Sequence, residues 1–127
     1  MSYDLAVWEG SRPADNDAAA DAYEDLCNRY LELDERLPPT GRIRDYVEAL
    51  LARWPDLGEE GSDDSPWAGS PILHEAVGPV LYLTIVWTRA EDASSHAAEL
   101  ARAHGLVCYD PQLECLRPSR SEPCRVQ

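Results

Sequence analysis

A run of carboxylates that ends in a tryptophan contains the residues best suited to recognising another molecule. The run lies in the acidic stretch 56–71, which is rich in Gly, Ser and Pro, and comprises Glu59, Glu60, Asp63, Asp64 and Trp67. This composition predicts a long exposed loop. An aromatic anchor within an anionic rim suits binding to Arg and Lys. We predict that these residues contact a partner, with one alternative open, in which Trp67 folds back to cover a sheet.

The first amphipathic helix offers a second candidate face. Its apolar positions recur at intervals of three and four from Ala19 to Leu33, and its acidic candidates are Asp21, Asp25 and Glu32. Calcium binding is not expected there. A calcium loop that began at Asp15 would need a glycine and a bidentate glutamate where Ala20 and Leu26 stand.

Catalytic signatures are not apparent. The seven scattered glycines form neither Gly-x-Ser-x-Gly nor a phosphate-binding loop, and the sequence has no Lys. Paired carboxylates such as Glu59 and Glu60 can do acid–base work, but in a loop they are more often simply solvated. We predict a binding protein rather than an enzyme, with no catalytic residues. An enzyme with an unrecognised site is the third hypothesis.

Histidine and cysteine spacing does not indicate a metal centre. His96 and His104 are eight residues apart, so they share a helix face but lie too far apart to hold one metal alone. Cys108, Cys115 and Cys124 lack the close Cys-x-x-Cys pair of zinc sites. Cys108, on an apolar strand, is expected to be a small core residue. We therefore predict no metal and no cofactor.

Charge points toward a basic protein partner. The net charge is -13, from 24 acidic residues and 11 basic ones, which are all Arg. Such a field repels phosphate, so nucleic acid and anionic membranes are disfavoured, whereas encounter with a basic protein is accelerated. Residues 1–66 carry 17 of the acids and six Arg, so the first half is where we expect the interaction surface. The alternative is that acidity only keeps the protein soluble.

Apolar periodicity predicts one α+β domain over residues 1–118, with a flexible tail at 119–127. Strands are predicted at 3–8, 72–77, 80–87 and 106–109, with a short edge strand at 113–116. Helices are predicted from a cap at Asp15 or Asp17, from Thr40 to Trp54, and from a capping box at Thr88–Glu91 to Gly105. The order β-α-α-β-β-α-β favours a mixed four- or five-stranded sheet with its helices mainly on one face.

The expected compartment is the cytoplasm. Residues 1–20 do not combine a basic start with an apolar run, and no segment approaches the length of a membrane span. Four cysteines are sparse for a disulfide scaffold, so we expect reduced thiols.

Two stretches carry a resemblance to known proteins. Met1-Ser2-Tyr3-Asp4-Leu5-Ala6-Val7-Trp8 and Gly105-Leu106-Val107-Cys108-Tyr109-Asp110-Pro111-Gln112 resemble the opening and closing strands of small bacterial proteins, some of which resemble immunity proteins of polymorphic toxin systems. The resemblance implies a cytoplasmic inhibitor of a toxin domain and identifies no functional residues. A basic, nuclease-type toxin whose active site is occluded would suit the acidity of this chain. The alternative is a regulatory adaptor or structural subunit that binds a non-toxin protein.

Overall fold

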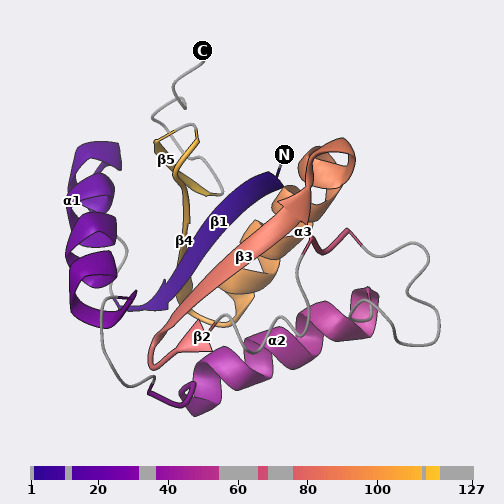
Figure 1. The fold of residues 1–127 in the computed structure, drawn as a ribbon, viewed down its shortest axis with the longest axis horizontal. Helices are drawn as coiled ribbons and strands as arrows, with labels where there is room; N and C mark the ends of the chain where they lie inside the picture. The colour runs from indigo at the N-terminus through magenta and orange to yellow at the C-terminus, as the bar shows by residue number, and fades with distance from the viewer. Residues whose placement is uncertain are drawn as a thin grey trace.

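Five strands and three α-helices make up the part of the chain that the structure describes (Figure 1). The computed structural model describes residues 2–10, 13–31, 37–54, 66–68, 76–112 and 114–117. The strands are β1 (Ser2–Glu9), β2 (Ala76–Val77), β3 (Val80–Val86), β4 (Leu106–Asp110) and β5 (Cys115–Arg117). The helices are α1 (Asn16–Leu26), which continues into a π-helical turn (Cys27–Leu31), α2 (Gly41–Arg53) and α3 (Ala90–Ala103), which follows a 3-10 turn (Trp87–Arg89).

The α+β fold class is confirmed, and the sheet has the strand order β2-β3-β1-β4-β5. The predicted mixed sheet is wrong for the described strands, because each of their four pairings is antiparallel. The physical reason is the position of β1. It lies between β3 and β4, so the two strands that α3 connects run parallel to each other without being neighbours. No sequence pattern reveals that insertion.

Strand β1 is apolar on both faces, and helices cover both. Leu5 and Val7 alternate with Ala6 and Trp8, and all four are buried. Helices α2 and α3 pack on the Leu5 and Val7 side, while α1 packs on the Ala6 and Trp8 side (Figure 1). The prediction that the helices lie mainly on one face therefore holds for two of the three described helices. It is wrong for α1.

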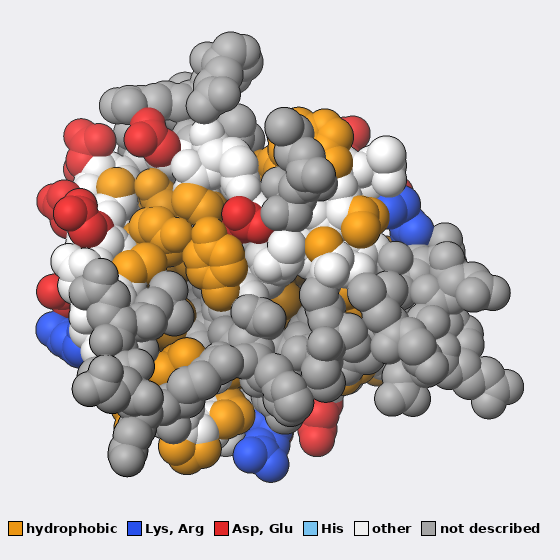
Figure 2. All heavy atoms as spheres, viewed as in Figure 1, with side chains coloured by type: hydrophobic (Ala, Val, Ile, Leu, Met, Phe, Trp, Pro, Cys, Tyr) orange, Lys and Arg blue, Asp and Glu red, His pale blue; other side chains and the backbone are white. Residues whose placement is uncertain are grey.

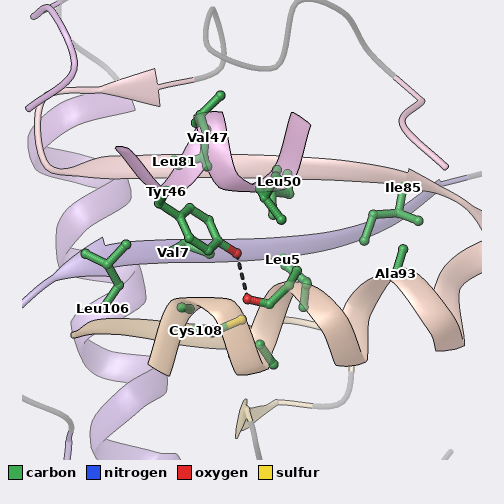
Figure 3. Packing of buried hydrophobic residues seen from close by; sticks show 14 of the residues in the cluster. Leu5, Val7, Tyr46, Val47, Leu50, Leu81, Ile85, Ala93, Leu106 and Cys108 are labelled. Carbon is green, nitrogen blue, oxygen red and sulfur yellow. Dashed lines mark hydrogen bonds between the residues drawn. The ribbon is translucent and has the colours of Figure 1, made fainter. Parts of the chain in front are cut away.

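The core beneath α2 and α3 is closed by a buried tyrosine. Tyr46 of α2 is fully buried and donates its hydroxyl hydrogen to the carbonyl oxygen of Ala97 in α3, at 2.7 Å (Figure 3). This bond satisfies a polar group that would be costly to bury alone. The aliphatic side chains around it are Leu5, Val7, Val47, Leu50, Leu81, Ile85 and Leu106. The contact links α2 to α3 within this core.

Helix ends follow the local sequence, with one exception. The Asp15 carboxylate accepts from the Ala18 amide at 2.8 Å, and the Thr40 hydroxyl accepts from the Ile43 amide at 3.3 Å, so both predicted caps are confirmed. Gly105 follows α3 with a φ of 71°, as a helix-terminating glycine does. The predicted capping box at Thr88–Glu91 is wrong. A 3-10 turn precedes α3, and no side chain caps its first residue.

Among the described residues, no helix is both long and apolar enough to cross a membrane.

The two faces of β3 allow a direct test of this packing. Leu83 is fully buried on the α2–α3 side, whereas its neighbour Thr84 points to the opposite face and is partly exposed. We expect Leu83→Ala to lower the free energy of unfolding by about 2–5 kcal/mol through lost burial and a cavity. Thr84→Ala should cost less than about 1 kcal/mol. Urea denaturation of both variants measures the difference, and equal losses would contradict the assigned facing.

Candidate functional site

The outer side of α1 carries a stripe of carboxylates. Asp17, Asp21, Glu24 and Asp25 are exposed, and the helix itself contains no basic residue. Asp25 pairs with Arg29 at 3.0 Å, but both side chains are more than 60% exposed, so this ion pair contributes little and is easily exchanged. Asp21, Glu24 and Asp25 are three and four residues apart and share one side of the helix. That side of α1 is a negatively charged surface.

The inner side of α1 leaves an apolar patch next to these carboxylates. Ala19 is buried, whereas Ala22, Tyr23 and Leu26 are only partly covered where they pack against the sheet. The Tyr23 ring lies 5.2 Å from that of Tyr109 in β4. Figure 2 shows hydrophobic side chains gathered on this face, flanked on the left by acidic side chains where Figure 1 draws α1. We call the exposed carboxylates and this patch together the α1 surface.

A chain of hydroxyl groups leads from the α1 surface to a carboxylate on the sheet. The Tyr23 hydroxyl donates to the Tyr82 hydroxyl at 3.4 Å, and the Tyr82 hydroxyl donates to Asp4 Oδ2 at 3.5 Å. Burial raises the pKa of Tyr82. Burial is also the main cause that raises the pKa of Tyr23, and the hydrogen bond to Tyr82 is the second. Both phenols therefore keep their protons at neutral pH and act as donors. We call Asp4, Tyr82 and Tyr23 the Asp4 site.

The backbone of Asp4 is held by a glutamine side chain. The Asp4 amide donates to Gln112 Oε1 at 2.6 Å, and Gln112 Nε2 donates to the Asp4 carbonyl oxygen at 2.7 Å. The register of β1 with β4 would place Pro111 opposite Asp4, and proline has no amide hydrogen to donate. The Gln112 side chain thus replaces main-chain pairing that proline interrupts.

The same glutamine is oriented by a buried carboxylate. Asp110 is fully buried, and its Oδ1 accepts from the Gln112 amide at 3.0 Å and from Gln112 Nε2 at 2.8 Å. The Tyr3 hydroxyl donates to Asp110 Oδ2. Consequently Tyr3 and Asp4 of β1 share one polar network with Asp110 and Gln112 at the end of β4. Its residues are far apart in sequence, so spacing alone did not identify it.

Trp67 is not the exposed anchor that the sequence suggested. Its side chain is fully buried, and its Nε1 donates to the Trp54 carbonyl oxygen at 2.8 Å. Its main chain forms an isolated antiparallel β-bridge with Ile85 of β3. The prediction of an exposed Trp67 is wrong, and the alternative that Trp67 folds back to cover the sheet is confirmed. The cause is the apolar area of the indole, which stabilises the protein when buried. The other loop candidates, Glu59, Glu60, Asp63 and Asp64, and the helix candidate Glu32 lie outside the described residues.

Trp54, the C-cap residue of α2, packs against the side chains of Arg53 and His96 as well as Trp67. The Arg53 guanidinium carbon lies 4.6 Å from the centre of the Trp54 ring system, and the His96 ring packs edge-on at 5.2 Å. Trp54 Nε1 and His96 Nε2 are buried and have no hydrogen-bond partner among the described residues. Burial lowers the pKa of His96, and the positive charge of Arg53 adds to the shift. His96 is therefore held in its neutral form at pH 7.

Within the described residues, no group of three or more His, Cys, Asp or Glu side chains could hold a metal ion. Cys108 is buried in the core, as predicted.

Comparison with protein-family models, curated proteins and solved structures found no match.

The Gln112 contacts predict a measurable loss of stability. Gln112→Ala removes the side chain that pairs with Asp4 and donates to the buried Asp110 carboxylate, so we expect the free energy of unfolding to fall by about 1–3 kcal/mol. The control Asn28→Ala removes an exposed amide and should change stability by less than about 0.5 kcal/mol. Chemical denaturation compares them. A loss for Gln112→Ala no larger than the control would show that the network is not stabilising.

The lowered pKa of His96 predicts that the stability of the protein depends on pH. Because folding lowers the pKa of His96, the unfolded chain binds the proton more readily than the folded chain. The contribution of His96 to the free energy of unfolding is therefore complete above about pH 6.5 and declines as the pH falls below that value. Between about pH 7.5 and about pH 5.5, the wild type should lose stability relative to His96→Gln. Urea denaturation of both proteins at both pH values tests this. A constant difference between them would refute the assigned role of His96.

Proposed function

We propose that this chain is an acidic binding protein that acts as an immunity protein. In this proposal it inhibits a basic, nuclease-type bacterial toxin domain by covering the active site of that domain. The observation that carries the proposal is the α1 surface, where exposed carboxylates border partly exposed apolar and tyrosine side chains. Interfaces take binding energy from such aromatic groups, and complementary charge accelerates association.

The mode of inhibition follows from the chemistry of the expected target. A nuclease attracts the phosphates of its substrate with basic side chains around its cleft. Asp17, Asp21 and Glu24 offer carboxylates to the same side chains, in a protein whose net charge is -13. An inhibitor bound there would exclude the nucleic acid by occupying its contacts. The resemblance of residues 1–8 and 105–112 to immunity-like proteins supports the same assignment.

We place this encounter in the cytoplasm. Cys27 carries a free thiol, as is usual in a reducing compartment.

Charge reversal on α1 tests the proposal. Asp21→Arg with Glu24→Arg should weaken capture of a basic domain from native lysate by at least about tenfold, because attraction becomes repulsion. The matched control is Glu48→Arg with Asp92→Arg, which makes the same change in net charge at exposed positions on α2 and α3. Affinity capture at low and high salt, followed by mass spectrometry, measures recovery. The captured domain is then assayed for nuclease activity with and without the protein.

The outcomes separate the hypotheses. Recovery of a basic nuclease that the wild type and the control inhibit, and the α1 variant does not, would support the proposal. Equal weakening by both double variants would show that net charge acts without a defined surface. A partner without toxin activity would overturn the immunity role in favour of an adaptor. Reversal of Asp63 and Asp64, tested alongside, determines whether the acidic segment 56–71 contributes to binding.

A further inference from the structure

One face of β3 is partly exposed from Tyr82 to the end of the strand. We call the three side chains on it, Tyr82, Thr84 and Val86, the open face of β3. We infer that the open face of β3 binds an amphipathic helix of the partner, with basic residues on the side of that helix that meets α1. The inference rests on the proposed function and deepens it, because it names the structural element of the basic partner that docks beside α1.

The open face of β3 lies on the side of the sheet that α1 covers. The strand register pairs Tyr82 with Ala6, which is buried in one cluster with α1, and directly opposite residues share a face. Val80, at the start of β3, is buried in the same cluster. The intervening side chains of β3 point the other way and are fully buried beneath α2 and α3. The cover that α1 provides therefore ends after Val80 and leaves the open face of β3 partly exposed.

The width of the sheet provides space for one more helix on this side. Neighbouring strands lie about 4.8 Å apart, so five of them span about 19 Å, whereas packed helices lie about 8–10 Å apart. Each face of the sheet can therefore hold two helices side by side. Helices α2 and α3 occupy both positions on one face, and α1 is the single described helix on the other (Figure 1). A partner helix over the open face of β3 would complete the second layer.

The open face of β3 offers rigid contact area to such a helix. Thr84 and Val86 are β-branched, so each has few side-chain rotamers to lose on binding. Tyr82 is already held by the hydrogen bonds of the Asp4 site. Figure 2 shows hydrophobic side chains at the surface beside the acidic side chains of α1. Side chains that are ordered before binding lose little entropy, and this preorganisation raises affinity for an apolar helix surface.

The charge of α1 specifies the flank of the partner helix. The Tyr23 hydroxyl lies 3.4 Å from the Tyr82 hydroxyl, so the Tyr23 side of α1 faces the open face of β3. At about 100° per residue, the exposed carboxylates nearest to Tyr23 around α1 are those of Asp17 and Glu24. A helix docked beside α1 would meet both carboxylates along its flank. Basic side chains on that flank would be attracted to them, whereas acidic side chains would be repelled.

Designed peptides test the inference without the natural partner. The probe is a peptide of about 18 residues of Leu, Ala and Arg, with Leu at helical intervals of three and four and Arg on both flanks. One control peptide has the same composition with Leu spread evenly around the helix. A second control replaces two central Ala residues by Pro, which keeps the charge and breaks the helix. Titrated into the ¹⁵N-labelled full-length chain, the probe should bind several-fold more tightly than either control, with the largest amide shifts from Tyr82 to Val86.

Substitutions of Thr84 should change the affinity for the probe in opposite directions. Thr84→Arg places bulk and positive charge on the open face of β3 and should lower the affinity by about tenfold. Thr84→Val keeps the shape and adds apolar surface, so it should raise the affinity by about twofold. The matched control is Thr88→Arg, which adds the same charge at an exposed position just after β3. It should change the affinity by less than about twofold, because the net charge hardly alters.

Equal weakening by the two Arg variants would overturn the inference. Equal affinity of the probe and either control peptide, or largest amide shifts outside β3, would also overturn it. Circular dichroism and the amide spectrum confirm that each variant is folded, and Thr84→Val supplies the test if Thr84→Arg is not.

Capture experiments separate this inference from the proposed function. If a basic toxin is captured and α1 reversal abolishes its binding while Thr84→Arg does not weaken it, the helix site is wrong and the immunity role stands. If the peptides behave as expected but no basic toxin is captured, the helix site stands and the immunity role fails.

Discussion

The burial of β1 on both faces is the constraint on which the rest of the structure depends. A strand that is apolar on both sides must lie in the interior of a sheet and must be covered by two separate layers. Leu5 and Val7 face α2 and α3, and Ala6 and Trp8 face α1. Its neighbours β3 and β4 pair with its main chain, and the Gln112 side chain takes the place of β4 at Asp4. The two helix layers follow from this requirement, whereas the antiparallel order follows from the position of β1 between β3 and β4.

The unequal cover on the two faces explains where the candidate site lies. Helices α2 and α3 close one face with a continuous core, including the Tyr46 contact between them. Helix α1 covers only part of the other face, because it packs beside β4, β5 and the second half of β1. Beyond α1, this face holds Asp4 and Tyr82, which are only partly buried.

Local sequence was sufficient for the elements but not for their arrangement. Alternation in β1, the caps at Asp15 and Thr40, and the turn at Gly105 are all encoded within a few residues, so the strands and helices were predictable. The insertion of β1 between β3 and β4 depends on pairing between distant segments. Neither the antiparallel sheet nor the placement of α1 on the opposite face could therefore be predicted from local sequence. Exposed carboxylates such as Asp21 were predictable from helical spacing. The burial of Trp67 was not predictable, because its contacts with Trp54 and Ile85 are tertiary. The proximity of Asp4 to Tyr82 and of Tyr82 to Tyr23 was not predictable for the same reason.

The contacts of β1 also determine when the protein can fold during its synthesis. The hydrogen bond between Asp4 and Gln112 spans 108 positions in the sequence, and β4 is made only after α3. At roughly 5–20 residues per second, β1 waits on the order of 5–20 s on the ribosome before its last neighbour appears. Until then, β1 lacks one of its two neighbouring strands. The carboxylates that α1 supplies soon after β1 place negative charge beside that segment, and repulsion between nascent chains of the same sign opposes their association.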